Sequence, residues 1–500
     1  MSMSRNLWFG VSSAIWSALV ALAVVPFYLT YLGVESYGLI GIYSAAYALF
    51  SLLDVGLSPA INREVARCAA AGNMRPAREL LHTLSIVYWS TAAVLVVVAI
   101  SVMPLLGQRW LTTSTLPLET LGDAFMLIGL IVACRWPHGL YHGALIGAER
   151  MAVVSTTAMA MTLISSVGAV AVLAWIAPTI EAFFVWQAAA GLLHVLVLRM
   201  FALRAVGREP LARFSVGALR SIWRFSAGTG AIAAAALVLT QVDKVVLSGV
   251  LPLPSFGEYM LAAVAVSSVY VVVNPVFNVI YPRFTALVAC GAQGQLEELY
   301  RSGTRLLTMA LFPLCMVLAI FAKDALLIWT GNQQLAEDVG PVLSLLVIGA
   351  ALHSVMYFPY ALQLAYGRTR LGLKIGVILL MVSAPLTALL AWRYGTIGGA
   401  AANVFLYAVY LLLGAWMTHR TLLTSIGWAW LLRDVCSPLL ICVSIGVLGS
   451  LLLTQGTWVS AEKIGLACLC LLLAWLGVLA AGPRSTVQQL LAPLTAKRRP

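Results

Sequence analysis

The sequence predicts an all-α, polytopic membrane protein with about 14 transmembrane helices, and three observations support this fold class. Apolar residues make up 62% of the 500 residues and charged residues only 10%, whereas roughly a quarter of the residues in a soluble domain are charged. The mean hydropathy is +0.96. Apolar runs long enough to cross a bilayer, about 20 residues each, recur along the whole chain. These runs leave no room for a sizeable soluble domain.

Short polar loops divide the apolar runs into fourteen predicted spans. No small-residue cleavage site follows the first run, so we interpret it as a retained span and not as a signal peptide. The predicted spans are 7–32, 37–58, 81–106, 121–146, 151–175, 180–203, 225–250, 256–281, 306–330, 340–366, 372–392, 396–418, 435–455 and 462–482.

Basic residues gather on alternate loops, which predicts the orientation. With the N-terminus in the cytoplasm, 24 of the 30 Lys and Arg residues lie in cytoplasmic segments. The opposite side receives Arg109, Lys323, Arg393 and Lys463. This asymmetry is the positive-inside pattern of membrane proteins, and it places both termini in the cytoplasm. It also explains the net charge of +12 without a nucleic-acid partner.

Polar, Gly and Pro residues repeat at an offset near 220 residues, which predicts two similar halves. Six spans per half keep both halves in one orientation, as in a parallel repeat with a site between the halves. We expect an N-terminal six-helix lobe (1–205), a basic cytoplasmic linker (206–224), a C-terminal six-helix lobe (225–418), two additional helices (435–482) and a basic tail (483–500). The matched residues are Arg5 and Arg224, Ser36 and Ser255, Asp54 and Asn274, Arg63 and Arg283, Gly72 and Gly291, Glu79 and Glu298, and Pro137 and Pro359.

Basic side chains also lie inside two predicted spans, where an ionised group is costly and calls for an explanation. Arg135, His138 and His142 share one helical face beside Pro137, at positions i, i+3 and i+7. They form either a cationic wall of a wet cavity or a structural group in which Arg135 binds carbonyls freed by the proline. Lys244 is predicted to act in transport or to belong to an interhelical ion pair.

Aromatic and amide side chains recur at helical spacing in both halves, which suits contact with sugar rings. Such stripes also occur as packing contacts between transmembrane helices. Acidic residues within spans, Asp54 and Asp243, are the candidates for coupling to an ion. The candidate sugar-contact residues are Tyr43 and Tyr47 in the first half and Tyr270, Asn274, Tyr357 and Tyr360 in the second.

Several classes of activity are excluded by missing motifs. No Gly-Lys dipeptide occurs, so the chain has no P-loop ATPase module. HExxH and GxSxG motifs and clusters of metal ligands are also missing, and the predicted outer loops are short. We therefore expect no enzymatic activity and no metal or cofactor, with H⁺ or Na⁺ as the candidate coupling ion.

The segment from Tyr31 to Leu39 (YLGVESYGL), with Leu53 to Leu57 (LDVGL) and Arg63 to Ala66 (REVA), resembles the start of Wzx-type O-antigen and exopolysaccharide flippases. These belong to the multidrug/oligosaccharidyl-lipid/polysaccharide exporter (MOP) superfamily. The resemblance implies a V-shaped pair of six-helix lobes in the inner membrane with alternating access. It implies transport of undecaprenyl-diphosphate-linked oligosaccharide to the periplasmic leaflet for surface polysaccharide, including lipopolysaccharide.

The resemblance also assigns roles to residues. Arg135 and Lys244, with His138 and His142, would form a cationic cavity for the diphosphate, and Arg63 and Arg283 would gate its cytoplasmic mouth. Expected partners are membrane lipids, a polysaccharide polymerase and chain-length proteins. Fourteen spans depart from the twelve of many such flippases and are similar to lipid II flippases, where the last two helices help to form a lipid groove. A lipid II-type flippase and a cation-coupled multidrug exporter are the alternatives, and a polymerase or ligase is a third class.

Overall fold

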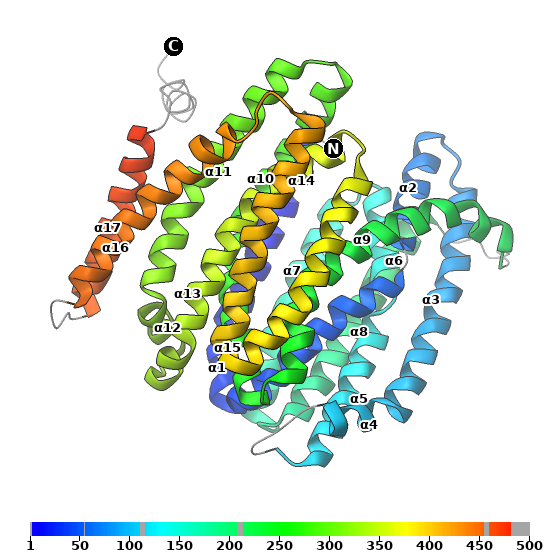
Figure 1. Ribbon diagram of the computed structural model, residues 1–500. Helices are drawn as coiled ribbons and strands as arrows, with labels where there is room; N and C mark the ends of the chain where they lie inside the picture. The colour runs from blue at the N-terminus through cyan, green and yellow to red at the C-terminus, as the bar shows by residue number, and fades with distance from the viewer. Residues whose placement is uncertain (1–2, 55, 111–115, 208–213, 455–459, 482–500) are drawn as a thin grey trace, which may run out of the picture. The chain divides into compact units, whose positions relative to one another are not determined.

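The computed structural model describes residues 3–54, 56–110, 116–207, 214–454 and 460–481, and throughout these ranges the regular structure is helical (Figure 1). The predicted all-α class is therefore confirmed. Ten helices in the described ranges are long and apolar enough to cross a membrane. The predicted number of fourteen spans stays a prediction.

Two of the long helices each extend over two predicted spans. In each helix a kink at a glycine separates the two spans. Helix α1 (Met3–Phe50) is interrupted at Gly33, which has φ 74° and ψ 172°. Helix α15 (Thr369–Leu422) is interrupted at Gly395, with φ 61° and ψ −141°. These backbone angles are accessible to glycine and strained for other residues, so both kinks are encoded by the sequence.

The chain divides into two compact units, Met1–Met260 and Leu261–Pro500. The predicted lobe boundaries stay a prediction. Part of the predicted linker (208–213) and the predicted basic tail (483–500) lie outside the described residues.

The first unit is built from long helices and short connecting helices. Helix α1 packs along α7, α5 along α8, and α2 along α6. Its elements after α1 are η1 (Ser51–Asp54), α2 (Leu57–Ala70), α3 (Arg75–Ser101), α4 (Met103–Trp110), α5 (Leu118–Arg135), α6 (His138–Gly147), α7 (Met151–Trp175), α8 (Ile180–Val206) and α9 (Val216–Val250).

The second unit is also helical and contains one short π-helix. Helix α10 (Leu253–Ala289) begins in the first unit and continues into the second. Helix α13 packs against α15, and α11 packs against α13, α16 and α17. The elements after α10 are α11 (Gln293–Ile320), α12 (Ala322–Thr330), α13 (Gln333–Val355), α14 (Tyr357–Ala365), α15, η2 (Leu431–Cys436), α16 (Ser437–Thr454) and α17 (Ser460–Ala481).

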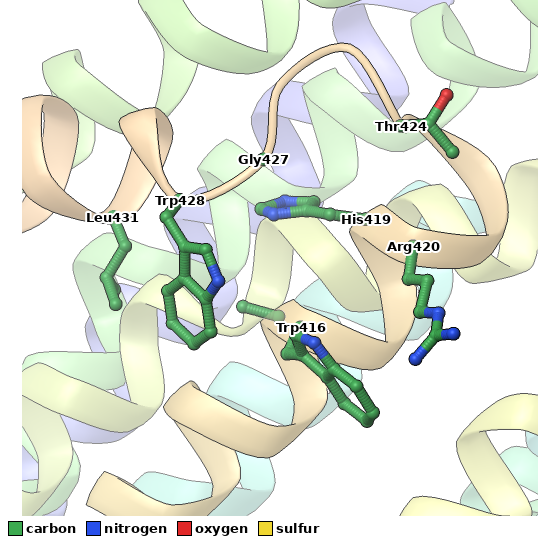
Figure 2. Close-up of a pocket in the computed structure, with 8 residues that line it drawn as sticks. Trp416, His419, Arg420, Thr424, Gly427, Trp428 and Leu431 are labelled. Carbon is green, nitrogen blue, oxygen red and sulfur yellow. The ribbon is translucent and has the colours of Figure 1, made fainter.

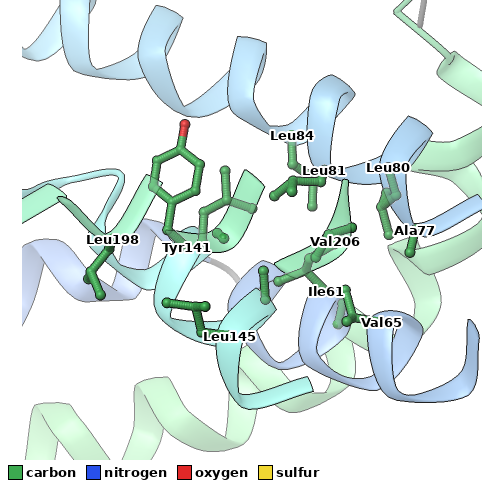
Figure 3. Packing of buried hydrophobic residues seen from close by; sticks show 14 of the residues in the cluster. Ile61, Val65, Ala77, Leu80, Leu81, Leu84, Tyr141, Leu145, Leu198 and Val206 are labelled. Atoms are coloured by element: carbon green, nitrogen blue, oxygen red, sulfur yellow. The ribbon is translucent and has the colours of Figure 1, made fainter. Parts of the chain in front are cut away.

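A buried apolar cluster joins α2, α3, α6 and α8 at one end of the first unit (Figure 3). Ile61, Leu84 and Tyr141 are fully buried in it, and burying such a side chain contributes about 1.5–3 kcal/mol relative to leaving it in water. The cluster holds the short helices α2 and α6 against the ends of the long ones. Helix α6 begins at His138, one residue after Pro137.

Close packing of α2 on α6 depends on glycine. A methyl group on Gly143 would lie 2.6 Å from the carbonyl oxygen of Ser58, and one on Gly147 would clash with Asn62. Small residues spaced four apart let helix backbones approach closely in membranes. The hydroxyl of Ser58 uses this proximity to donate a hydrogen bond to the carbonyl of Gly139 at 2.6 Å.

The backbone interruptions of the first unit recur in the second at the same offset as the sequence repeat. Gly72 and Gly291 both adopt positive φ, at 70° and 67°, shortly after the ends of α2 and α10. Helix α5 breaks before α6 at Trp136, and α13 breaks before α14 at Met356; in each case the amide donates to the carbonyl three residues earlier. The repeated backbone supports a common helical plan for both units.

Candidate functional site

Arg135 is the last residue of α5, and the break before α6 determines where its side chain lies. Pro137 cannot donate an amide hydrogen bond, so the helix is interrupted directly after Arg135. Its aliphatic stem passes over Gly191 of α8, where a methyl group would lie 2.6 Å from the Arg135 Cγ atom. Glycine at this position therefore makes room for the arginine.

The guanidinium of Arg135 lies among aromatic rings and one amide. Its Cζ atom is 5.8 Å from the ring centroid of Tyr43 and 5.7 Å from that of Tyr47, both on α1. Its Nη2 atom donates a hydrogen bond to Oε1 of Gln187 at 3.0 Å. The Nε atom is buried and has no hydrogen-bond partner among the described residues. A cation–π contact contributes about 0.5–1 kcal/mol when exposed and about 2 or more when desolvated.

Three histidines lie next to this arginine along α6 and α8. The rings of His138 and His142 are stacked with centroids 5.4 Å apart, and the ring of His194 meets His138 edge-on at 4.8 Å. Together with Arg135 they form a basic side-chain group within the first unit. We call Arg135, Tyr43, Tyr47, Gln187 and the three histidines the arginine–tyrosine cluster.

Asp243 and Lys244 are neighbours on α9 that bind different partners. The hydroxyl of Tyr259 donates to Oδ2 of Asp243 at 2.7 Å. The ammonium of Lys244 donates to the carbonyl of Thr240 at 3.1 Å and to the side chain of Gln241 at 3.3 Å. Successive residues on a helix point about 100° apart, so this divergence is expected.

Asp54 ends η1 and connects it to the next two helices. Its Oδ2 atom accepts a hydrogen bond from the amide of Ser58 at 3.1 Å, in the first turn of α2. Its Oδ1 atom accepts a short hydrogen bond from the hydroxyl of Tyr88 on α3. The carboxylate therefore has a structural function, whether or not it also binds an ion.

The second unit contains an aromatic cluster built from α10, α13, α14 and α15. The hydroxyl of Tyr270 hydrogen-bonds to Nδ1 of His353 at 2.9 Å. The ring of His353 stacks on Tyr407 with centroids 4.4 Å apart and meets Tyr357 edge-on at 5.6 Å.

One row of stacked rings extends this cluster along α10. Phe277 stacks on Tyr281 at 5.8 Å and on Tyr360 at 6.0 Å, with interplanar angles of 5° and 19°. Asn274 and Asn278 on the same helix are exposed. Stacked rings beside exposed amides are groups that bind planar or ring-shaped ligands through their faces and edges.

Comparison with known families identifies the chain. The sequence profile described as "Polysaccharide biosynthesis protein" matches residues 4–288. The chain belongs to this polysaccharide biosynthesis family. Comparison with curated proteins gave no match.

Solved structures similar to this polysaccharide biosynthesis protein are flippases and transporters. The lipid II flippase MurJ, in an inward closed conformation, superposes with a TM-score of 0.72 at 12% identity, covering 98% of this chain and 99% of that one. An inward-facing MATE multidrug resistance transporter of the MOP superfamily has a TM-score of 0.60 at 15% identity, with 84% and 96% covered. The MATE transporter VcmN of Vibrio cholerae has a TM-score of 0.58 at 14% identity, with 84% and 97% covered. The chain therefore shares the fold of these solved flippase and transporter structures.

Some of the predicted site residues lie close together within each unit of the structure. Arg135, His138, His142, Tyr43 and Tyr47 share the arginine–tyrosine cluster, and Tyr270, Tyr357 and Tyr360 share the aromatic cluster. Arg63 on α2 and Arg283 on α10 are exposed, and their predicted gating role stays a prediction.

Sequence reasoning missed Gln187 and His194 on α8, although a signal for them exists. They are seven residues apart and thus lie on one helical face. It also missed Phe277, Tyr281 and Tyr407, whose aromatic character alone does not separate them from ordinary packing residues.

Two further cavities lie in the second unit. An apolar cavity of about 360 Å³ is lined by α11, α13 and α16, including Phe312, Met316 and Gly446. A smaller one of about 270 Å³ lies at the end of α15, where Trp416 and Arg420 of the helix and Trp428, after the loop that follows it, line the cavity (Figure 2). Tryptophan and arginine at a helix end are typical of the membrane–water interface.

Proposed function

We propose that this polysaccharide biosynthesis protein translocates undecaprenyl-diphosphate-linked oligosaccharide from the cytoplasmic to the periplasmic leaflet of the inner membrane. Alternating access moves the substrate, and both chain termini lie in the cytoplasm. The observation that carries the proposal is Arg135, whose guanidinium packs against two tyrosine rings inside an apolar helical unit.

The chemistry of the substrate matches this side-chain group. A diphosphate cannot enter hydrocarbon unaccompanied, because an isolated buried charge is strongly disfavoured. A guanidinium provides paired donors for phosphate oxygens, and these charge-assisted hydrogen bonds are among the strongest in proteins. The tyrosines on α1 and the aromatic cluster of the second unit are suited to sugar rings. Lys244, His138 and His142 supply further donors.

A lipid-linked substrate also needs an apolar path, and the apolar cavity beside α16 is suited to a hydrocarbon chain. A multidrug exporter for organic cations is less compatible with Arg135, because like charges repel and the arginine–tyrosine cluster contains no acid. A lipid II-type flippase remains the second candidate. The fold similarity to MurJ over 98% of the chain supports it, and the two candidates differ in the sugar part of the substrate.

Transport against a gradient requires coupling, for which Asp54 and Asp243 are the proposed H⁺- or Na⁺-binding groups. Each already accepts a hydrogen bond from a tyrosine hydroxyl. Protonation of either carboxylate would change these contacts, which offers a physical link between ion binding and helix position. A polymerase and chain-length proteins are the proposed downstream partners, and no catalytic role is assigned to the chain.

The test is complementation of a deletion strain with Arg135→Gln, measuring surface polysaccharide and the amount of protein in the membrane. We expect polysaccharide to fall to about a tenth or less at unchanged protein level, since one charge-assisted hydrogen bond contributes about 1.5–3 kcal/mol. Arg135→Lys keeps the charge and should retain partial function. Arg109→Gln, on the predicted opposite side, is the matched control. Normal polysaccharide with Arg135→Gln would refute the assignment of this site.

A further inference from the structure

We propose that a third cavity in the second unit, of about 420 Å³ and lined by α11, η2, α16 and α17, binds the phosphate group of a membrane lipid. Arg301, Arg305 and Arg433 line it together with a single acid, Asp434. The cavity therefore carries an excess of two positive charges. A lipid phosphodiester carries one negative charge and satisfies part of this excess.

The acid in the cavity, Asp434, forms ion pairs with two of the arginines. The Asp434 side chain is 2% exposed. Its Oδ2 accepts a hydrogen bond from Nε of Arg301 at 2.9 Å, and its Oδ1 forms an ion pair with Nε of Arg305 at 3.1 Å. In the described part of the chain these two arginines make their hydrogen bonds through Nε. Their terminal Nη groups remain for a ligand in the cavity.

The third arginine is held by a short π-helix. Arg433 is exposed and lies next to Asp434 within η2 (Leu431–Cys436). Two contacts to α11 anchor this turn: the indole of Trp430 donates to the Thr304 hydroxyl at 3.1 Å, and the Thr308 hydroxyl donates to the Asp434 carbonyl at 3.2 Å. π-Helical turns are rare and often lie at functional sites. The anchoring fixes the backbone turn that carries Arg433, which reduces the backbone entropy lost when a ligand binds.

The surroundings of the cavity favour a lipid over a free anion. Leu432 lines it and is 62% exposed, while Leu440 on α16 and Leu476 on α17 are 64% and 62% exposed. Leu432 is the chain neighbour of the exposed Arg433, and exposed leucine beside arginine is typical of the boundary between hydrocarbon and headgroups. A phosphate in the cavity would leave the acyl chains of the same lipid on these leucines. The sequence predicts the cytoplasmic leaflet for this end of the helices.

The experiment is native mass spectrometry of the full-length protein in neutral detergent with four probes. These are phosphatidylglycerol, phosphatidylcholine, undecaprenyl diphosphate and inorganic phosphate. We expect phosphatidylglycerol to bind at least about tenfold more tightly than phosphatidylcholine, whose positive headgroup opposes the cavity charge. Arg433→Gln should weaken this binding about tenfold, as expected for one lost charge-assisted hydrogen bond.

Two further variants separate binding from folding. Arg301→Lys keeps a cation beside Asp434 while removing the planar fork, so it should weaken lipid binding without lowering the melting temperature by more than a few degrees. Arg420→Gln removes the same charge from the neighbouring cavity and serves as the control. Equal losses with Arg433→Gln and Arg420→Gln would overturn the proposal, because general surface charge would then explain them.

The probes distinguish the source of the phosphate. Tighter, Arg433-dependent binding of phosphatidylglycerol assigns the site to a resident membrane lipid, and tighter, Arg433-dependent binding of undecaprenyl diphosphate assigns it to the carrier lipid. Either result supports the proposal. Equal binding of inorganic phosphate, or no Arg433-dependent binding of any probe, overturns it. These measurements involve no transport, so they are independent of the function proposed above.

Discussion

At the scale of single residues, the central feature is the environment of Arg135. Its neighbours attract the positive charge of the guanidinium but carry no negative charge of their own. Two aromatic faces and one amide oxygen contact the guanidinium, and in the described residues of the cluster no carboxylate does so. An arginine paired with an acid would have its charge satisfied within the protein. An arginine packed against aromatic rings keeps its attraction for an anionic ligand, which is the property that the proposed substrate requires.

The ring of Tyr47 should matter more than its hydroxyl. Tyr47→Phe keeps the aromatic face over Arg135, whereas Tyr47→Leu removes a cation–π contact of about 0.5–2 kcal/mol. We expect Tyr47→Phe to support normal surface polysaccharide and Tyr47→Leu to reduce it about three- to thirtyfold. Quantifying polysaccharide at matched protein levels checks this. Equal loss in both variants would show that the hydroxyl, not the ring, is the functional group.

The two proposed properties of Asp54, structural and ion-coupling, are separable by substitution. Asp54→Asn keeps an oxygen that accepts from the amide of Ser58 but removes the charge and the protonation site. We expect it to abolish transport while lowering the melting temperature by only a few degrees. Tyr88→Phe removes one hydrogen bond to the carboxylate, worth about 0.5–1.5 kcal/mol, and should keep transport. If Asp54→Asn transports normally, the coupling role is wrong.

At the scale of elements, the first unit relies on glycine to bring α2 and α6 together. Gly143→Ala would place a methyl group 2.6 Å from the Ser58 carbonyl oxygen, and such overpacking costs about 1–3 kcal/mol. We expect a melting temperature several degrees lower, measured on the detergent-purified protein.

Gly139 is the matched control on the same helix. A methyl group added at Gly139 would lie 3.6 Å from the nearest atoms, which belong to the Ser58 side chain, and this is an ordinary van der Waals distance. Gly139→Ala should leave stability unchanged or raise it, because alanine is favoured over glycine in a helix by about 1 kcal/mol. A fall as large as that of Gly143→Ala would contradict the packing explanation.

The limits of the helices could be predicted from the sequence where they coincide with the ends of apolar runs. They could be predicted less well where a helix continues into polar residues or breaks within an apolar run. Among the described residues each predicted range overlaps helical segments, and α7 has the predicted limits of 151–175. Helix α11 begins at Gln293, although only residues from 306 onward are apolar, because its polar first turns extend beyond the membrane-spanning part. It also ends at Ile320, so the predicted range 306–330 contains a break that hydropathy cannot reveal.

The candidate site was predictable in part. Helical spacing predicted one face for Arg135, His138 and His142, although the helix is interrupted between Arg135 and His138. The pairs Asp54 with Tyr88 and Asp434 with Arg301 join helices far apart in the sequence. Such contacts depend on tertiary packing, which spacing along one helix does not describe.

At the scale of the whole molecule, the predicted orientation has a direct test in the native cysteines. Cys290 is exposed at the end of α10, on the predicted cytoplasmic side. Burial, with a further contribution from Glu64, raises the pKa of the Cys68 thiol, so this cysteine stays protonated and unreactive at neutral pH.

A membrane-impermeant maleimide should therefore label Cys290 in inverted vesicles and not in intact spheroplasts. Arg109→Cys adds an exposed thiol on the predicted periplasmic side, and it should be labelled in spheroplasts. Labelling of Cys290 in spheroplasts, and of the Arg109→Cys variant only in inverted vesicles, would show that the predicted orientation is wrong.

The central claim is that the protein moves a lipid-linked oligosaccharide between leaflets, and the leaflet distribution of that lipid tests it most directly. In cells lacking the protein, the undecaprenyl-linked oligosaccharide should accumulate on the cytoplasmic face. It should return to the periplasmic face on complementation with the native chain and not with Arg135→Gln. Normal arrival of the oligosaccharide at the periplasmic face in the deletion strain would contradict the claim and assign the protein a different substrate.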